Sequence, residues 1–527
     1  MNWLRYTFRA IFVPLENGLD RLTGPAWNPL NHLGGLGFFF YWIVAVSGIY
    51  LYIFFDTGTT AAYQSVEYMT NEQWYLAGVM RSLHRYASDA LVLFMVIHIV
   101  REFSLDRYRG ARWFTWVTGM PIIWLVFAAG ITGYWMVWDK LGHYVALVTA
   151  EWFDWLPIFG EPIARNFINP AFLESRFFTL LVFMHIILPL VLLGVLWIHL
   201  QRVSRPRINP PLGLAIGMFA MFLVLSFVQP ATSQGPANLS TVPSRVELDW
   251  FYLAAYPLFD LWSNATVWGV AAVLSLMIVV LPLMPPMRRP APALVDLANC
   301  NGCTRCVDDC PFAAVSMGPR TDGQSYQRQA IVSDNLCLSC GLCAGTCPTS
   351  LPFKNTREIS PGIDLPGHSI DRLRETVDKE AGRLTGKQRI VVFGCERGPG
   401  LKGLHNNETA TVSLPCVGML PPSFVDYVLS RGLAEGVVLT GCQPDGCYFR
   451  YGIELTEQRL AGTRDPKLRK RVPRDRISTV WAGPGGARAL SRAVASFRKS
   501  LPAIPDITPP DGPPKAPREY IKAVSDG

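Results

Sequence analysis

Residues 81–103 read RSLHRYASDALVLFMVIHIVREF, and this stretch decides the fold of the first half of the chain. It is long and apolar enough to cross the hydrocarbon core of a bilayer, which takes about 20 helical residues. It also carries His84 and His98, which are 14 residues apart. That interval is just under four helical turns and about 21 Å of rise, so both histidines lie on one face of the helix.

The same 14-residue interval recurs on three other apolar stretches. It separates His185 from His199, Gly34 from Gly48, and Gly119 from Gly133. Two facing helices marked in this way can hold two flat metal macrocycles, and imidazole from both sides is a usual way to hold an electron-transfer haem. Glycine lets a large ring approach a backbone closely, although glycines also pack membrane helices together. We therefore predict two haems held by the four histidines.

The composition divides the chain into a membrane half and a water-soluble half. Of the 527 residues, 50% are apolar and only 17% are charged, whereas a soluble protein carries roughly 25% charged residues. These values exclude a disordered chain, a collagen and a small disulfide scaffold. The apolar excess precedes Met287, and all 12 cysteines follow it, from Cys300 onward. We expect six membrane spans, near residues 34–55, 76–101, 113–136, 177–200, 211–230 and 264–285.

Arginines on alternate loops predict the orientation of these spans. They are Arg5, Arg9, Arg21, Arg101, Arg107, Arg109, Arg112, Arg202, Arg205, Arg207, Arg288 and Arg289. We therefore expect both termini in the cytoplasm, and the net charge of +8 needs no nucleic-acid partner to explain it. Apolar and basic residues interleave in the first 33 residues, which predicts an amphipathic helix at the membrane surface.

Four motifs of the apolar half resemble the cytochrome b subunit of respiratory and photosynthetic cytochrome bc complexes. They are the 81–103 stretch, HIILP from His185, LPIFG at 156–160 and GYWMVWDK at 133–140. The similarity covers about residues 20–285. Because the second and fourth predicted spans both run inward, we expect His84 and His185 to hold an outer haem b. His98 and His199 then hold an inner haem b.

The segment ELDWFYLAAYPLF at 247–259 resembles the PEWY segment of that family. The resemblance implies a quinone site at the outer face, because the family's glutamate lies in the quinol-oxidation pocket and takes part in proton transfer. Asp249 keeps a carboxylate at that position, whereas Phe251 replaces the tyrosine. The alternative is that Asp249 merely ends a surface loop. Nothing in the chain is equivalent to the family's Rieske partner, so full bifurcating quinol oxidation is not expected.

Eight cysteines follow the apolar half in two runs of CxxCxxCxxxCP. They are Cys300, Cys303, Cys306 and Cys310, then Cys337, Cys340, Cys343 and Cys347. This is the spacing of a bacterial-type ferredoxin with two [4Fe–4S] clusters, in which the fourth cysteine of each run ligates the other cluster. Cluster one should therefore take Cys300, Cys303, Cys306 and Cys347, and cluster two Cys337, Cys340, Cys343 and Cys310. Disulfides are unfavourable in the cytoplasm, and zinc gives no reason for the double run.

Residues 388–500 alternate short β-rich runs with helical patterns, which predicts an α/β domain with a parallel sheet. The last four cysteines follow or lie near the ends of strand runs, and ligands collect at the carboxyl edge of such a sheet. They are Cys395, Cys416, Cys442 and Cys447.

LPCVGMLPPSFVDYVLSRG at 414–432 and GCQPDGCYFRYG at 441–452 resemble the delta subunit of methyl-viologen-reducing hydrogenase. That resemblance covers about 388–465 and implies a [2Fe–2S] cluster that exchanges electrons with flavoproteins of the heterodisulfide-reductase type. Gly398 stands where that family commonly has a further cysteine. Structural thiols or a zinc site are the alternatives.

We therefore expect a multidomain chain in five parts. They are an interfacial N-terminus (1–33), an all-α six-helix cytochrome b-like membrane domain (34–287), an α+β ferredoxin-like domain (291–356), an α/β domain with a parallel sheet (385–500) and a Pro-rich tail (501–527).

Our first hypothesis is an electron-transfer subunit of a bacterial cytoplasmic membrane. It would link a soluble cytoplasmic flavoprotein or heterodisulfide-reductase-like dehydrogenase to the quinone pool, with the direction of electron flow left open. The alternative is a haem- and cluster-bearing anchor of a partner redox enzyme, without a quinone site of its own. By analogy with cytochrome b, we expect a homodimer.

Overall fold

The computed structural model describes residues 2–24, 26–168, 173, 175–201, 208–240, 245–284, 290–353 and 358–501. The chain divides into two compact units, Met1–Arg288 and Arg289–Gly527, and each is described by itself. Several residues with a predicted role lie outside the described ranges. They are Arg202, Arg205, Arg207, Arg288, Arg289 and the predicted Pro-rich tail from residue 502.

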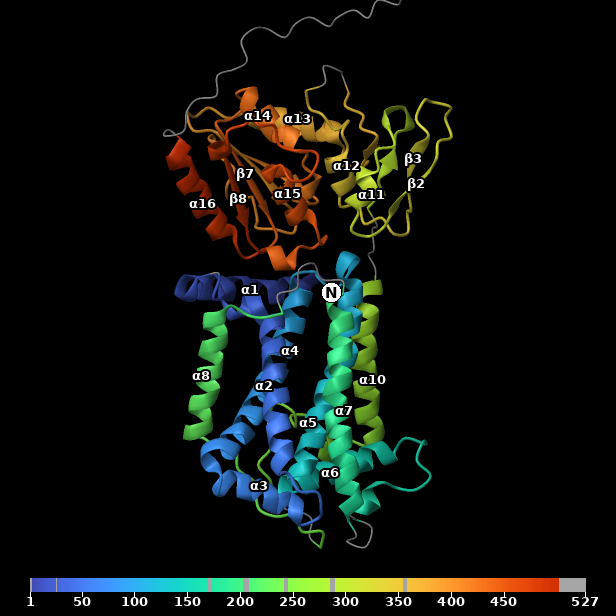
Figure 1. The fold of residues 1–527 in the computed structure, drawn as a ribbon, viewed down its shortest axis with the longest axis vertical. Helices are drawn as coiled ribbons and strands as arrows, with labels where there is room; N and C mark the ends of the chain where they lie inside the picture. Colours follow the sequence, from blue (N-terminus) through green and yellow to red (C-terminus); the bar gives the residue numbers. More distant parts are fainter. Residues whose placement is uncertain are drawn as a thin grey trace, which may run out of the picture. The chain divides into compact units, whose positions relative to one another are not determined.

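The regular elements in the described part of the first unit are helices, joined by loops and by one isolated β-bridge between Asp139 and Pro236 (Figure 1). Its helices are α1 (Asn2–Thr23), α2 (Leu33–Phe54), α3 (Ala61–Asn71), α4 (Val79–Ser104), α5 (Trp113–Val137), α6 (Lys140–Asp154), α7 (Ser175–Leu200), α8 (Leu212–Val228), α9 (Pro257–Leu261) and α10 (Asn264–Val280). Five helical stretches are long and apolar enough to cross a membrane: Pro29–Phe54, Trp74–Ser104, Gly110–Val137, Ser175–Leu200 and Asn264–Leu283. The predicted span at 211–230 forms α8, an apolar helix of 17 residues.

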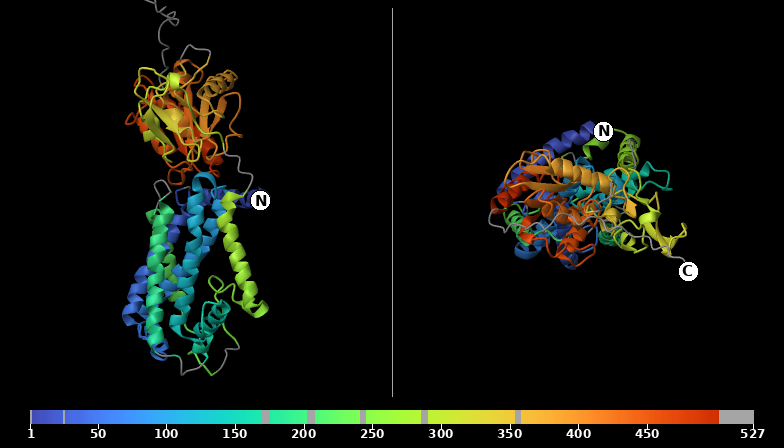
Figure 2. Two further views of the ribbon diagram at one scale, coloured as in Figure 1. Left: turned by 90° about the vertical axis from the view of Figure 1, so that its right-hand side faces the viewer. Right: turned by 90° about the horizontal axis from the view of Figure 1, so that it is seen from above.

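Two helix pairs make the centre of this unit. Helix α2 packs along α4, and α5 packs along α7. Apolar side chains fill both contacts: Leu36 and Phe40 of α2 pack in one cluster with Leu83 of α4, and Val126 of α5 packs in another with Leu192 of α7. Figure 2 shows these long helices running side by side along most of their length. Histidines on α4 and α7 are therefore held at fixed heights within one bundle.

Helix α1 lies across the ends of the long helices of its unit (Figure 1). Its exposed apolar side chains include Trp3, Leu4 and Ile11. Its buried Glu16 forms an ion pair with Arg101 of α4, with Oε1 and Nε 2.6 Å apart. The expected helix is present, and a buried ion pair attaches it to the bundle.

The second unit begins with two small antiparallel pairs. Strand β1 (Leu294–Val295) pairs with β4 (Ile363–Asp364), and β2 (Val315–Pro319) pairs with β3 (Arg328–Val332). Two short helices, α11 (Arg305–Asp308) and α12 (Leu342–Thr346), lie within the two cysteine runs. Helix α13 (Ile370–Ala381) leads into the following region. This mixture of strands and helices is consistent with the expected ferredoxin-like fold.

A four-stranded parallel sheet forms the rest of this unit. Its strands are β5 (Ile390–Cys395), β6 (Thr409–Leu414), β7 (Gly436–Gly441) and β8 (Ile477–Trp481), in the order β6-β5-β7-β8. Helices α14 (Pro422–Ser430), α15 (Gly452–Ala461) and α16 (Ala487–Ser500) connect or follow these strands. Both central strands, β5 and β7, are buried along their whole length, as their continuous apolar sequences require. The predicted α/β domain with a parallel sheet is confirmed.

Candidate metal centres

Four histidines form two pairs between α4 and α7. The rings of His84 and His185 have centroids 6.3 Å apart and planes inclined by 53°. His98 and His199 are close enough to interact electrostatically. Because a metal–imidazole bond is about 2 Å long, the first separation leaves room for one metal atom between the rings. The structure thus brings together the same two pairs that the sequence predicts.

Three of these imidazoles have their Nδ1 atom engaged by a neighbouring helix. His84 Nδ1 lies 2.9 Å from the carbonyl oxygen of Val44. His185 Nδ1 lies 3.0 Å from Thr132 Oγ1, and His199 Nδ1 lies 3.1 Å from Thr118 Oγ1. A hydrogen bond at one ring nitrogen fixes the orientation of a metal-binding imidazole and leaves the other nitrogen for the metal. These rings therefore fit the role of haem ligands.

The two threonines were missed by the sequence reasoning, although a signal was present. Thr118 and Thr132 are separated by the same 14-residue interval as the histidines, and each directly precedes a predicted haem-packing glycine. The repeated Thr-Gly pair therefore marks both positions where α5 contacts an imidazole of α7.

Each of the four predicted glycines faces one of the four histidines. A Cβ atom added at Gly48 would lie 3.0 Å from His84 Cε1, and one at Gly133 would lie 3.1 Å from His185 Cε1. At Gly119 the distance to His199 Cε1 would be 3.7 Å, and at Gly34 the distance to His98 Cε1 would be 4.0 Å. The glycines give room to the imidazoles, most tightly at the His84–His185 pair.

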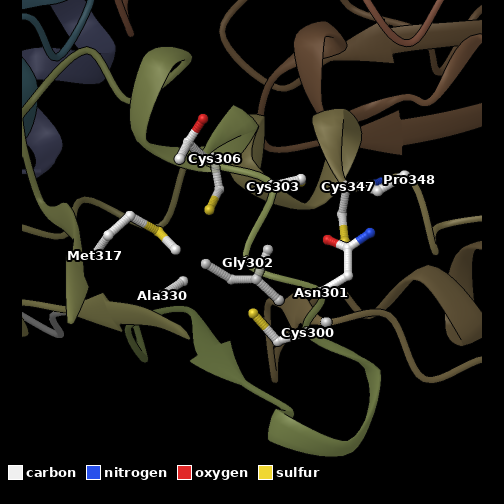
Figure 3. A pocket seen from close by; sticks show the side chains of 12 residues that line it. Cys300, Asn301, Gly302, Cys303, Cys306, Met317, Ala330, Cys347 and Pro348 are labelled. Carbon is white, nitrogen blue, oxygen red and sulfur yellow. The ribbon is translucent and has the colours of Figure 1, made fainter. Parts of the chain in front are cut away.

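The cysteines of the two ferredoxin runs gather into two groups of four. Cys300, Cys303, Cys306 and Cys347 line one pocket. Cys310, Cys337, Cys340 and Cys343 line another. Figure 3 shows Cys300, Cys306 and Cys347 pointing into the space that they share. Each group contains three cysteines of one run and the fourth cysteine of the other, which is the predicted division.

Glycines with positive φ angles shape the loops that carry these cysteines. Gly302 has a φ of +68° and Gly341 a φ of +77°, a region that other residues rarely adopt. A Cβ atom at Gly302 would lie only 2.6 Å from the carbonyl oxygen of Arg328. The backbone can therefore turn tightly around each pocket between successive cysteines.

Burial in these pockets favours the neutral form of the cysteine thiols, so their thiolate form needs a cation beside it. Burial, together with the neighbouring Cys303, Cys347 and Cys300, raises the pKa of the Cys306 thiol to about 12. Burial likewise raises the pKa of Cys340 above its ordinary value. A metal can take the place of the proton, because thiolate is the form that binds it. The donor set therefore fits a metal centre rather than a group of bare thiolates.

Neither a disulfide nor a close single-ion site is found among the described cysteines. No disulfide joins any of the twelve cysteines. Within the residues that the structure describes, no three His, Cys, Asp or Glu side chains are placed to hold a single metal ion.

The last four cysteines lie at the carboxyl edge of the parallel sheet. Cys395 ends β5, Cys416 follows β6, and Cys442 follows β7, with Cys447 in the next loop. All four are buried, and the sulfur atoms of Cys395 and Cys442 are 4.0 Å apart. Cys416 interacts with Cys395 and Cys447, which completes the group. A Cβ atom at Gly452 would collide with the sulfur of Cys416, so this glycine makes room for the group.

Gly398 lies beside this group without space for a side chain. A Cβ atom there would lie 2.9 Å from the carbonyl carbon of Gly441. Since Gly398 stands where the resembling family commonly has a cysteine, a thiol at this position would require the loop after β5 to move. The four cysteines that are present are therefore the available donors.

Asp249, the predicted quinone-site residue, lies in a buried ion-pair network. Its Oδ1 accepts a hydrogen bond from the Phe251 N–H at 2.8 Å, and its Oδ2 accepts one from the Tyr134 hydroxyl. Arg85 approaches the same Oδ2 at 3.2 Å and reaches Asp89 at 3.1 Å. Asp249 is thus not a surface carboxylate, and both of its oxygens are engaged.

Comparisons with known families identify three domains. Residues 19–205 match the family described as cytochrome b/b6/petB. Residues 299–351 match the 4Fe-4S dicluster domain, and residues 400–504 match the delta subunit of methyl-viologen-reducing hydrogenase. The cytochrome match ends before the segment that carries Asp249. A solved structure titled "Hyperthermophilic respiratory Complex III" is similar over 48% of this chain and 75% of that chain, with 19% sequence identity and a TM-score of 0.39.

These matches and the apolar helices define a class of protein: a multi-pass membrane protein of electron transport that carries haem b and [4Fe–4S] clusters. More particularly, the chain joins a cytochrome b/b6 domain, a 4Fe-4S dicluster domain and a hydrogenase delta-subunit domain, in that order. The predicted resemblances are confirmed.

Substitution of Gly133 by leucine should disturb one haem. A Cβ atom at Gly133 would already lie 3.1 Å from His185 Cε1, so the rest of a leucine side chain would press on the imidazole ring. We expect the haem content of the purified protein, measured from its reduced optical spectrum, to fall by about half, since His185 serves one of two haems. Gly194→Leu on α7 is the control, because a Cβ atom there meets nothing within 4 Å. Equal haem content in both variants would contradict the role of the glycine.

Proposed function

We propose that this chain is a membrane-bound electron-transfer subunit that links a cytoplasmic dehydrogenase, such as a flavoprotein of the heterodisulfide-reductase type, to the quinone pool. The proposal is supported by one observation: the histidines and the cysteines gather into separate groups of possible metal ligands. Two histidine pairs and three groups of four cysteines gather within the two units. Every cysteine of the chain belongs to one of these groups.

The proposed ligands follow from these groups. His84 with His185 would hold the outer haem b, and His98 with His199 the inner one. The two ferredoxin groups would each hold one [4Fe–4S] cluster, and Cys395, Cys416, Cys442 and Cys447 would hold one [2Fe–2S] cluster. When bound, haems and iron–sulfur clusters accept and release single electrons. The chain's own residues hold these groups in place, exclude water from most of them and set the charge around them.

The proposed membrane arrangement places both termini in the cytoplasm of a bacterial cell. It rests on the arginines of alternate loops, because basic residues are retained on the cytoplasmic side. A cytoplasmic location suits the cysteines, since thiols stay reduced there. The proposed homodimer rests on analogy with cytochrome b alone.

An iron count tests the three proposed clusters. Two [4Fe–4S] clusters and one [2Fe–2S] cluster predict about ten non-haem irons per chain of the purified protein. Cys442→Ser should lower the count by about two, whereas Cys303→Ser should lower it by about four, because the two residues belong to groups of different proposed size. About eight irons in the unmodified protein would exclude the [2Fe–2S] cluster.

The engaged carboxylate of Asp249 favours the second candidate function, that of an anchor without a quinone site. Its contacts with Arg85, Tyr134 and the Phe251 N–H give the side chain a structural role. The same contacts also place the Tyr134 hydroxyl beside the carboxylate, and a hydroxyl–carboxylate pair can hold or move a proton near a quinone. A measurement of quinone turnover therefore distinguishes a quinone-linked subunit from an anchor without a quinone site.

Asp249→Asn should slow quinone turnover by at least about tenfold while chemical reduction of the haems stays unchanged, because general acid–base catalysis by a carboxylate is worth roughly 10²–10⁴ in rate. Turnover is measured with the partner or with an artificial electron donor. Glu247→Gln is the control, since Glu247 is exposed and two residues away. Unchanged turnover in Asp249→Asn would retire the outer quinone site and favour the anchor.

A further inference from the structure

The group of cysteines proposed for cluster two adjoins the group proposed for the [2Fe–2S] cluster, inside the second unit. Gly341 and Gly345 lie beside Cys340 and Cys343, and Met419 lies in the turn that follows Cys416. A Cβ atom at Gly341 would lie 2.6 Å from Met419 Cγ, and one at Gly345 would lie 2.7 Å from the Met419 carbonyl oxygen. Cys340 and Cys416 also interact electrostatically. The two cysteine-bearing loops are therefore packed directly on each other.

One arginine joins these two loops. Arg459 of α15 is 1% exposed, and its guanidinium donates from Nη2 to Asp309 Oδ2 at 2.6 Å and from Nη1 to the Gly418 carbonyl oxygen at 2.7 Å. Asp309 directly precedes Cys310, and Gly418 follows Cys416 by two residues. A single buried side chain thus holds one loop of each cysteine group.

The contacts of Arg459 leave part of its hydrogen-bonding capacity unused. Its buried Nε has no hydrogen-bond partner among the described residues. Buried donors in proteins are almost always paired, so an unpaired one calls for an acceptor that belongs at this position. Cys416 interacts electrostatically with the guanidinium. The sulfur of a metal centre at this edge of the sheet is an acceptor of the right kind, and its negative charge suits a guanidinium.

We infer that Arg459 is a positioning residue that fixes the Cys310 and Cys416 loops against each other and raises the reduction potential of the two adjoining clusters. The inference rests on the proposed function, in which both cysteine groups hold clusters. The potential of an iron–sulfur cluster depends on the local net charge, on hydrogen bonds to its sulfurs and on solvent exposure. Arg459 brings a positive charge and a free N–H to a buried place beside both groups. It therefore favours the reduced, more negative state of each.

Arg459→Met tests the effect of the charge in the full-length, detergent-solubilised protein. Each cluster is followed by its electron paramagnetic resonance signal during a redox titration. We expect cluster two and the [2Fe–2S] cluster to become harder to reduce, with the reduced-to-oxidised ratio at a fixed potential falling about tenfold, which is about 59 mV for one electron. Cluster one, held by Cys300, Cys303, Cys306 and Cys347, should keep its potential.

Arg464→Met is the matched control. Arg464 also pairs with Asp309, its Nε lying 2.7 Å from Oδ1, but its side chain is 34% exposed. Its other guanidinium contact is with the Asp308 carbonyl oxygen, on the Cys310 side alone. A partly exposed charge is screened by solvent, so we expect a change of less than about threefold in the same ratio. Equal shifts in the two variants would show a general loss of positive charge and overturn the specific role of Arg459.

Arg459→Lys separates charge from position and serves where Arg459→Met does not fold. Lysine keeps the charge but lacks the planar guanidinium that donates to Asp309 and to the Gly418 carbonyl oxygen at the same time. In Arg459→Lys we expect the reduction potentials of cluster two and the [2Fe–2S] cluster to lie closer to those of the unmodified protein than they do in Arg459→Met. We also expect a weaker spin–spin interaction between these two clusters when both are reduced. An unchanged spin–spin interaction would overturn the positioning role.

The unmodified protein supplies a measurement that needs no variant. The electron paramagnetic resonance signal of the [2Fe–2S] cluster should relax faster when cluster two is reduced. Reduction of cluster one should not speed its relaxation to the same extent. Relaxation that follows cluster one instead would overturn the inferred contact. Absence of any [2Fe–2S] signal, with an iron count of about eight, would overturn the proposed cluster itself, which is a separate failure.

Discussion

The close approach of glycine backbones to imidazole rings is the contact on which the membrane unit depends. Each of the four histidines on α4 and α7 lies against a glycine of the neighbouring helix, α2 or α5. A larger side chain at Gly48 or Gly133 would push the ring away and separate helices that are packed along their length. The glycine contacts therefore fix three features together. These are the spacing of the paired helices, the orientation of the imidazole rings and the hydrogen bonds at Nδ1. Bulk apolar packing surrounds that arrangement.

A comparable constraint acts in the second unit, where buried thiols replace buried imidazoles. The parallel sheet brings three strand ends to one edge and so gathers cysteines that are distant in the sequence. The ferredoxin-like region gathers its own cysteines through tight loops that need glycine. Arg459 joins the two regions through Asp309 and Gly418. Burying this charge is favourable only because it is paired and hydrogen-bonded on both sides.

Features that depend on local spacing could be predicted from the sequence. The histidine interval follows from helical periodicity, the division of the eight ferredoxin cysteines from the double run, and the parallel sheet from its apolar strands. Features that depend on distant contacts could not. Tyr134 meets Asp249 across 115 residues, and Asp309 meets Arg459 across 150 residues. Nothing near Arg459 in the sequence marks it as a residue that joins two cysteine groups. The α8 region also shows that hydropathy predicts an apolar segment better than it predicts the length of its helix.

We propose that one chain carries haems in its membrane unit and iron–sulfur clusters in its second unit, and that all of these centres take up electrons. The most direct measurement is an anaerobic coulometric titration of the purified full-length protein, with the haems followed optically and the clusters by electron paramagnetic resonance. Two haems, two [4Fe–4S] clusters and one [2Fe–2S] cluster predict an uptake of about five electrons per chain. An uptake of about two electrons, all of them appearing in the haem spectrum, would contradict the claim.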